Sequence, residues 1–501
     1  MSTIWKKGSP LSPTSRAGFA TPLNLGLTPQ ALRCRPLPRA GGGALCDALR
    51  HLTMLMKKST PLLSTVLLVA LLLCSGVFAQ RRQGQAARAF RALHEVNQVA
   101  RPDANHVVAI VGATLVDGRG GAPVLDAVVV VRGERIVAVG KRASVSIPAG
   151  AEVVDANGLT LVPGLIDSHF HIDGDDPLPA LYLTHGITSV RDPGQWIEAY
   201  DVARKGPAAV PRLFLCGPHL DSPPPAYPRD SFIVRDAEET RLAVNRFADD
   251  GASAIKVYFR LPLALIRVAT ETAHARGLPV ISHLEIVDAT DAIRAGVDGV
   301  EHATSFGTAL LPLRDAEKYR QAVLADNNAR SEGRYQVWNA IDLDSPRARA
   351  VFKLIVERGT VVSPTLAVFE RQLGDKDTTE MHVHAFKQME AFVGHAFRAG
   401  AHVVVGSHSD VPHAKRGWAY QRELELLVES GLTPMQAIVA GTLENARYFR
   451  ASDRLGSIEP GKLADLVLVE GNPLRNISDM RRLKRVMLNG EWVNGVGAGE
   501  K

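Results

Sequence analysis

Two histidines separated by one residue, His169 and His171, end the apolar stretch LVPGLIDSHFHID at residues 161–173. In an extended strand alternate side chains share a face, so the two imidazoles can reach the same ion. A pair of this kind is by itself more often structural, because a metal site needs further ligands. The pair becomes informative only if other ligands lie at the ends of other strands.

Further groups able to bind metal lie within or at the ends of other strand-like apolar runs. These are Lys256 in SAIKVYF, His283 ending LPVISH, His302 ending DGVEH, and His408 and Asp410 in GSHSD. An unpaired buried ammonium is costly, so Lys256 needs a partner or a chemical modification, unless its side chain reaches solvent at the rim. Together these residues predict a metal site with several ligands.

The segments that would position these residues alternate between strand-like and helix-like patterns. The candidate strands are LTLVPGLID, GITSVRD, PRLFLCG, SAIKVYF, LPVISH, DGVEH, GTVVSPT and HVVVGS. Helical patterns such as DAEETRLAVNRFADDGA separate most of them. The alternation predicts an α/β fold, a (β/α)8 TIM-like barrel over residues 160–454, in which strand ends share one mouth. An open doubly wound sheet is the alternative, although no glycine-rich phosphate-binding turn follows an early strand.

The two ends of the chain are rich in valine and isoleucine and in turn residues, which is typical of short strands. We expect residues 107–159 and 455–496 to form one small β-sandwich domain. Two segments exceed what a barrel needs: a charged, helical insertion between Thr304 and Arg349, and the proline-rich loop DSPPPAYPRD after the third strand. Both are expected to rise from the active-site face as a substrate lid.

The stretch that begins at Met56 has the parts of a secretory signal, namely two lysines, an apolar core and the small-x-small site Val77-Phe78-Ala79. We therefore expect residues 1–55 to be a non-structural leader, 56–79 a signal peptide and 80–106 a linker or helix. The mature protein would be periplasmic or secreted, without stable membrane insertion. A single membrane anchor is the alternative, although the apolar core is shorter than the ~20 residues that span a bilayer.

The positive net charge of +6 comes from residues 1–79, which carry nine Lys/Arg and one Asp, whereas the remaining 49 Lys/Arg and 51 Asp/Glu give −2. Nucleic acid is therefore not an expected partner. Three of the four cysteines, Cys34, Cys46 and Cys74, precede the cleavage site. Only Cys216 remains, so no internal disulfide can form and a large core must stabilise the exported chain.

Several stretches carry a resemblance to a known family: VPGLIDSHFH, GITSVRDPG, AIKVY, GVDGVEH, ESGLTPMQAIVAGTLENAR and LGSIEPGKLADLVLVEGNP. From Val107 to Asn494 the chain resembles the amidohydrolase superfamily, especially its imidazolonepropionase-like and Xaa-Pro dipeptidase-like branch. The resemblance implies two divalent metal ions, with zinc expected. It implies one ion on His169 and His171, the other on His283 and His302, and Lys256, carboxylated by carbon dioxide, as the bridge. Carboxylation would turn a buried cation into an anionic ligand.

The chain departs from that family at the eighth strand. The family usually reads Gly-Thr-Asp there, and this chain reads Gly406-Ser407-His408, with Asp410 two residues later. Either histidine replaces the acid or the strand end is displaced. Because residues 408 and 410 share a face in an extended strand, both could point inward, and we expect Asp410 to accept the proton with His408 beside it. Tyr258 is expected either to contact the substrate or to pack in the core.

The resemblance implies a metal-dependent amidohydrolase that cleaves a C–N bond in a small amide, cyclic amide or dipeptide through a metal-bound hydroxide. A lactonase or deaminase of the same superfamily is an alternative, because the same site can attack esters and amidines. A non-catalytic exported metal-binding barrel protein is another, because GSHSD lacks the usual acid. The expected partner is a small molecule or dipeptide, and a homo-oligomer is compatible with the sequence.

Overall fold

The structure, a computed structural model, describes residues 92–496, so the predicted leader and signal peptide at 1–55 and 56–79 lie outside the described residues. Within the described part of the predicted linker or helix, residues 92–106 form no helix. The segment pairs with the body instead, where Val96 N donates to Leu213 O at 3.0 Å. Among residues 92–496, no helix is both long enough and apolar enough to cross a membrane.

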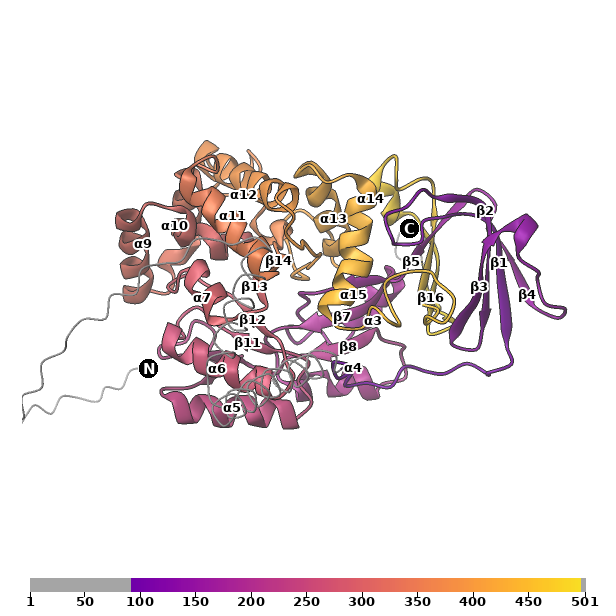
Figure 1. The fold of residues 1–501 in the computed structure, drawn as a ribbon, viewed down its shortest axis with the longest axis horizontal. Coiled ribbons are helices and arrows are strands. Elements are labelled where there is room, and N and C mark those ends of the chain that lie inside the picture. Colours follow the sequence, from indigo (N-terminus) through magenta and orange to yellow (C-terminus); the bar gives the residue numbers. More distant parts are fainter. Residues whose placement is uncertain (1–91, 497–501) are drawn as a thin grey trace, which may run out of the picture. The chain divides into compact units, whose positions relative to one another are not determined.

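Strands from the two ends of the chain lie in one sheet, as Figure 1 shows by the indigo and yellow strands that lie together. They are β1 (Val107–Leu115), β2 (Val124–Arg132), β3 (Arg135–Lys141), β4 (Glu152–Asp155), β5 (Leu159–Pro163), β15 (Leu466–Glu470), β16 (Leu483–Leu488) and β17 (Glu491–Trp492). Their order is β17-β16-β15-β5-β1-β2-β3, with β4 beside β1. Continuous pairing through β5 and β1 thus gives one mixed sheet of eight strands, where the sequence predicted a sandwich.

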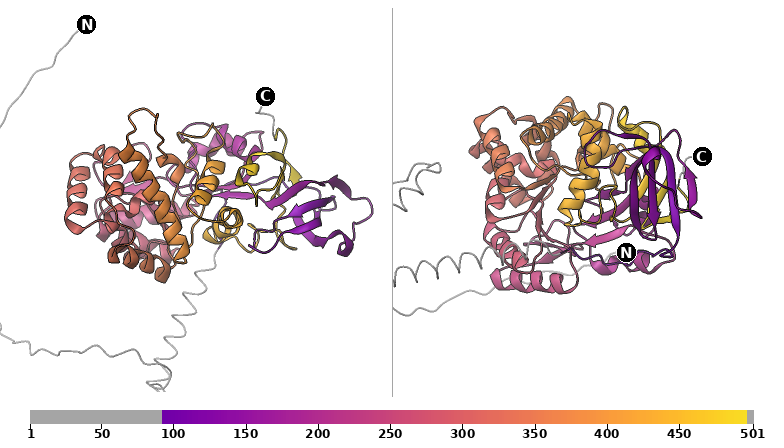
Figure 2. Two further views of the ribbon diagram at one scale, coloured as in Figure 1. Left: turned by 90° about the horizontal axis from the view of Figure 1, so that it is seen from above. Right: turned by 45° about the vertical axis from the view of Figure 1, so that its right-hand side comes forward.

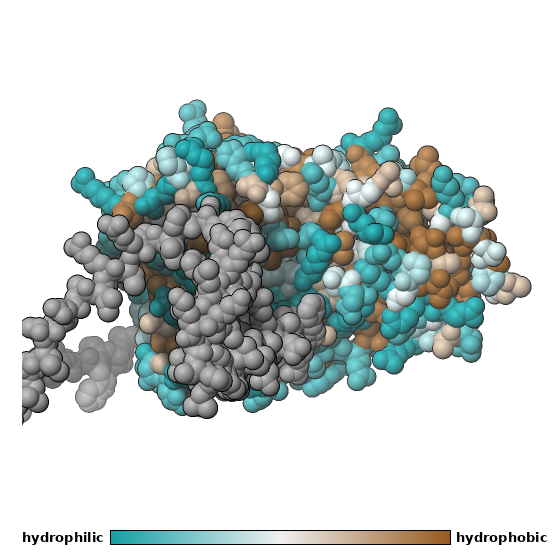
Figure 3. Space-filling view, in the orientation of Figure 1, coloured by the Kyte–Doolittle hydropathy of each residue, from teal (hydrophilic) through white to brown (hydrophobic). Residues whose placement is uncertain are grey.

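The small sheet buries apolar side chains on both faces. One cluster includes Ile110, Val129 and Leu468, and a separate one includes Val111 and Val128. Apolar residues also gather on the surface at the end of the molecule formed by β1–β4 (Figure 3). Because both faces are apolar, β1 and β2 read as nearly continuous Val/Ile runs and not as alternating patterns.

The body between these ends is built from parallel strands in two groups. One group is β6 (Leu165–Asp167), β7 (Ile187–Asp192) and β8 (Arg212–Leu215). The other is β9 (His219–Asp221), β10 (Ser231–Ile233), β11 (Ile255–Val257), β12 (Val280–Ser282), β13 (Gly299–Glu301) and β14 (Val361–Ser363), in the order β10-β9-β11-β12-β13-β14. The short strands β9 and β10 flank the proline-rich loop and were not predicted.

Backbone hydrogen bonds connect the two groups at both junctions. On one side Ser253 N donates to Leu215 O at 2.7 Å. On the other, a parallel bridge joins Val362 to Val403, and Ser168 N donates to Val405 O at 3.0 Å. The predicted eighth strand, HVVVGS, is therefore reduced to a bridge at Val403. The predicted TIM-barrel-like α/β fold with an extra domain is therefore confirmed as an overall architecture.

Helices cover the outside of the parallel strands, as the two views of Figure 2 show. They are α3 (Leu178–Thr184), α4 (Asp201–Lys205), α5 (Ala237–Asp249), α6 (Leu263–Ala275), α7 (Ala289–Ala295), α11 (Pro346–Arg358), α12 (Glu380–Arg398), α13 (Ala419–Glu429), α14 (Pro434–Val439) and α15 (Asn445–Tyr448). Helix α5 illustrates why they form: Asp236 caps its first turn, and Ala243, Val244 and Phe247 lie buried on one face.

The run LTLVPGLID is divided between the small sheet and the body. Residues 159–163 form β5 in the small sheet, and 165–167 form β6 in the body. Gly164 separates them, and a Cβ there would lie 2.3 Å from Thr188 Oγ1, so only glycine fits at this close approach. The two units therefore share this run, whereas the sequence placed their boundary before Thr160.

The insertion between Thr304 and Arg349 is helical, as expected. It contains α8 (Gly307–Leu310), α9 (Leu313–Ala325) and α10 (Ala329–Asn339). It meets the proline-rich loop directly: Asn327 Nδ2 donates to Pro224 O at 3.2 Å, and Arg330 Nη2 donates to Tyr227 Oη at 2.8 Å. The two segments expected to form a lid are thus in contact with each other.

Candidate active site

A cavity of about 310 Å³ opens where the parallel strands end. Six histidines line it: His169, His171, His219, His283, His302 and His408. Lys256 and Tyr258 line it as well. The structure therefore brings His169, His171, Lys256, His283, His302 and His408 to one cavity, but not Asp410.

The first group of imidazoles consists of His169, His171 and His408, whose nearest ligand atoms all lie within 4.8 Å of one another. The backbone holds the eighth segment against the first strand, because His408 N donates to His169 O at 2.7 Å. Gly406 permits this approach, since a Cβ at that position would lie 2.7 Å from His169 Cβ. Three imidazoles at this spacing can hold one divalent ion and leave a position open.

The second group, His283 and His302, lies beside the first. The two ring centroids are 4.4 Å apart, and the ring of His302 lies 4.6 Å from that of His169. His302 follows β13 and has a left-handed φ of +68°. This backbone conformation is unfavourable for any residue that has a Cβ, so it is kept only where surrounding contacts stabilise it. Thr365, also left-handed at φ +46°, faces it, with Oγ1 2.7 Å from His302 Nδ1.

Each of four histidines has an oxygen beside one ring nitrogen. The pairs are His169 Nδ1 with Glu301 Oε2 at 2.6 Å, His171 Nδ1 with Asp192 Oδ1 at 3.5 Å, His302 Nδ1 with Thr365 Oγ1 at 2.7 Å, and His283 Nε2 with Glu285 Oε1 at 3.2 Å. Such partners fix the orientation of an imidazole and leave its other nitrogen for a metal. That nitrogen is Nε2 in His169, His171 and His302, and Nδ1 in His283.

Burial keeps most of these imidazoles neutral, which is the form that binds metal. It lowers the pKa of His169 to about 4, against the opposing charge of Glu301, and the pKa of His283 to about 3. Burial also holds the pKa of His302 and of His408 well below its ordinary value. The exception is His171. Burial lowers its pKa too, but the Asp192 carboxylate has the larger effect, and the pKa is raised.

Lys256 is buried in the middle of β11 and forms an ion pair with Glu301, which is fully buried. The sequence predicted that this lysine needs a partner or a modification, and the structure supplies a partner. Burial works against ionisation of Glu301, but Lys256 and His169 outweigh it and lower its pKa. Sequence reasoning missed Glu301, although its place directly before His302 at a strand end was a usable signal.

Asp410 does not join the cluster. It is exposed and is absent from the lining of the cavity, whereas His408 belongs to that lining. The expectation that residues 408 and 410 share a face assumed an extended strand. His408 and Ser409 instead have left-handed φ values of +63° and +64°, so the chain turns at this point and directs only His408 inward. His408, and not Asp410, therefore lines the cavity beside the first imidazole group.

Tyr258 and His219 form one wall of the cavity, with ring centroids 4.1 Å apart. The ring of Tyr258 also lies 4.7 Å from that of His283. His219 Nε2 lies 2.8 Å from Ser231 Oγ, which leaves Nδ1 as its second nitrogen. His219 was not predicted, because it lies in β9, a strand that the sequence pattern did not reveal.

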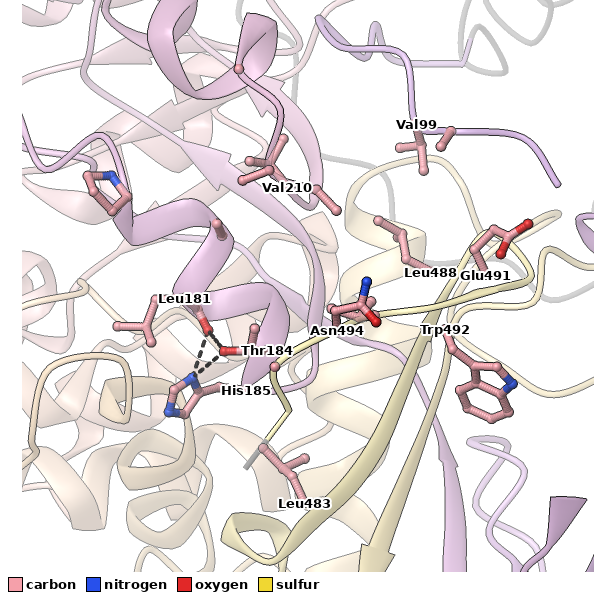
Figure 4. Close-up of a pocket in the computed structure, with 18 of the residues that line it drawn as sticks. Val99, Leu181, Thr184, His185, Val210, Leu483, Leu488, Glu491, Trp492 and Asn494 are labelled. Atoms are coloured by element: carbon pink, nitrogen blue, oxygen red, sulfur yellow. Dashed lines mark hydrogen bonds between the residues drawn. The ribbon is translucent and has the colours of Figure 1, made fainter. Parts of the chain in front are cut away.

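A larger cavity of about 1330 Å³ lies between α3 and the C-terminal strands. Figure 4 shows Leu181, Leu483 and Leu488 around it, together with Trp492. It shares no lining residue with the histidine cavity and brings together no cluster of metal ligands among the described residues. The histidine cavity is therefore the candidate active site.

The donor set of the histidine cavity fits divalent metal. Neutral imidazoles with fixed rings suit zinc and similar ions, and carboxylates beyond them are the usual support for such ligands. Parallel strands with this cluster at their carboxyl ends define a TIM-barrel-like enzyme site.

Comparison with known proteins identifies the family. Residues 160–493 match the amidohydrolase family, and the chain belongs to it. The predicted membership of the amidohydrolase superfamily is confirmed.

Individual relatives are more distant. The chain is 33% identical over 205 residues to N-acyl-D-aspartate deacylase of Alcaligenes xylosoxydans xylosoxydans, covering 39% of this chain and 36% of that protein. It is 26% identical to an adenine deaminase of Lactiplantibacillus plantarum, covering 68% and 52%. The chain thus spans about a third and about half of the length of these relatives. A crystal structure of a Xaa-Pro dipeptidase with bound methionine shares the fold, with a TM-score of 0.60, 23% identity and coverage of 77% and 99%.

Proposed function

We propose that the protein is a metal-dependent hydrolase of an amide bond in a small molecule or dipeptide. The observation that carries the proposal is the set of five imidazoles gathered at one cavity, four of which have an oxygen beside one ring nitrogen, so that the other nitrogen is left to bind metal. A structural histidine cluster would not need such uniform orientation.

In this proposal His169, His171 and His408 hold one ion, with His408 in the role of the family's aspartate. His283 and His302 hold the second, and Lys256, carboxylated, lies between the groups. Divalent ions, zinc being favoured by imidazole ligands, would acidify a water molecule and polarise the scissile carbonyl. Glu301 would orient His169, and the wall of His219 and Tyr258 would contact the substrate.

Carboxylation of Lys256 would require its ammonium to lose a proton and leave the ion pair with Glu301, after which the neutral Nζ would bond to carbon dioxide and release a second proton to solvent, giving an anionic carbamate. The burial of both side chains supports this proposal, because an anionic lysine derivative between two cations is better compensated than an ammonium there. Infrared or ¹³C resonance spectra of protein prepared with ¹³C-bicarbonate and zinc would reveal the carbamate. The Lys256→Ala variant provides the blank.

The test of the function is a metal analysis of the purified protein combined with a screen of N-acyl amino acids, dipeptides and cyclic amides. The proposal predicts bound divalent metal and hydrolysis that chelator abolishes and zinc restores. A metal-loaded protein inactive on the whole library would contradict it and favour a non-catalytic metal-binding barrel. Because one relative is an adenine deaminase, purines belong in the screen, and ammonia release from them alone would favour a deaminase.

We also propose that the mature enzyme acts in the periplasm or outside the cell.

A further inference from the structure

The active-site cavity contains one cation for which the proposed chemistry has no use. Arg334, in the inserted helix α10, lines the cavity together with the metal-binding histidines. Its side chain is 15% exposed, and the other lysine or arginine among the cavity-lining residues is Lys256, which the proposed function turns into an anion. A buried guanidinium is retained where planar, charged recognition matters.

The surroundings of Arg334 hold its guanidinium in a fixed position. Nε donates to Glu285 Oε1 at 2.6 Å, and Tyr319 Oη donates to the other oxygen of Glu285 at 2.5 Å. Arg334 and Glu285 thus form a buried ion pair, with 15% and 1% of their side chains exposed. Glu285 itself is not among the cavity-lining residues. The cavity therefore meets the donors of the guanidinium, while the carboxylate lies behind it.

The outer nitrogens of the guanidinium lie next to the second imidazole group. Nη2 lies 2.6 Å from Glu285 Oε1 and 3.3 Å from His283 Nε2, whereas Nη1 makes no hydrogen bond with any residue in the range 92–496 and is the nitrogen left to bind an anion. The ring of Phe369, which also lines the cavity, lies 5.6 Å from the guanidinium carbon. An anion bound here would lie beside the apolar ring of Phe369 and close to His283, where the proposed function places the second metal ion and the scissile amide.

We propose that Arg334 binds a carboxylate of the substrate, so that the enzyme acts on N-acyl amino acids or dipeptides with a free α-carboxylate and discriminates against neutral amides. The inference rests on the proposed function. In such substrates one carbon atom separates the carboxylate from the scissile nitrogen, which suits an arginine adjacent to His283. Charge-assisted hydrogen bonds of this kind are among the strongest that a side chain forms.

The test uses zinc-loaded protein and a set of N-acetyl amino acids and dipeptides, each paired with its own C-terminal carboxamide. The acid should have a kcat/KM roughly 10- to 100-fold above that of the amide, the factor expected for a charged hydrogen bond. Arg334→Gln should bring this ratio close to one. Arg334→Lys, which keeps a charge for Glu285 but loses the planar fork, should give an intermediate ratio. Arg320→Gln, which removes a similar arginine from Asp288 outside the cavity, should leave the ratio unchanged.

Binding provides a second readout that does not depend on turnover or on the stability of one variant. Calorimetry on metal-free protein should show tighter binding of N-acetyl amino acids than of their amides. Equal hydrolysis of acids and amides by the natural protein would overturn the inference and leave the proposed function intact. Hydrolysis of neither would contradict the proposed function, and equal binding of the two forms would then overturn the inference as well.

Discussion

Removal of His408 is expected to cost far more than removal of Asp410. His408 is one of three imidazoles whose ligand atoms lie within 4.8 Å, and its ring centroid is 4.8 Å from that of His171. Loss of even a supporting residue around a metal ligand typically lowers metal affinity ~10–100-fold, and loss of one ligand in three should cost at least about 100-fold. His408→Ala should therefore lose zinc and activity together.

Asp410→Asn, by contrast, changes an exposed side chain outside the cavity. Surface changes of this kind alter free energies by about 0.5 kcal/mol or less, so activity should stay within roughly threefold of the natural enzyme. His408→Asp is the informative control, because it restores the family's acid and should retain metal. Zinc affinity is measured by competition with a chelator, and kcat at saturating zinc. An Asp410→Asn enzyme that keeps its metal but loses ~10²–10⁴ in kcat would refute this reasoning, because that loss is typical of a removed proton acceptor.

Four further outcomes are expected. Glu301→Gln should lower zinc affinity ~10–100-fold, because Glu301 lies beside the His169 ring, and in metal-free protein it should destabilise the fold by about 3 kcal/mol or more, because the Lys256 ammonium loses its buried partner. Chelator competition and urea unfolding measure the two effects, and unchanged values would contradict the role of Glu301. Lys256→Ala should lose metal and activity, with partial recovery in added formate or acetate; full zinc content would exclude the bridge. In metal-free protein the pKa of His169 is lowered from 6.5 to about 4, so between these pH values the unfolded chain binds a proton that the folded chain does not. The free energy of unfolding should therefore fall by roughly 3 kcal/mol as the pH drops from 6.5 to 4. A free energy of unfolding in urea that does not change over this pH range would contradict the prediction. N-terminal sequencing of protein from the native host should find a start near Gln80, whereas an intact segment from Met56 in the membrane fraction would indicate an anchor.

Much of the site could be predicted from strand-end chemistry. His169, His171, His283 and His302 end apolar runs, and parallel strands bring their carboxyl ends together, so their meeting follows from the pattern. Glu301 could have been found by the same rule, since it precedes His302. Arg334 could not, because it lies in an inserted helix, and no local pattern shows that its side chain reaches His283, 51 residues away in sequence.

The errors arose where the backbone leaves regular geometry. The expectation for Asp410 assumed an extended strand, and left-handed residues at His408 and Ser409 redirect the chain. The run LTLVPGLID reads as one strand, yet the close approach of Gly164 to Thr188 divides it between two sheets. Such departures depend on tertiary contacts, which a local pattern of apolar residues does not contain.

The most direct test of the account is zinc titration of the purified, metal-stripped protein, with hydrolysis of N-acetyl amino acids followed in parallel. The account predicts that activity appears with bound zinc, saturates at two ions per chain, and is lost when His169 or His283 is replaced by asparagine. Full activity in the stripped protein, or saturation of both sites without any hydrolysis of a C–N bond, would contradict it.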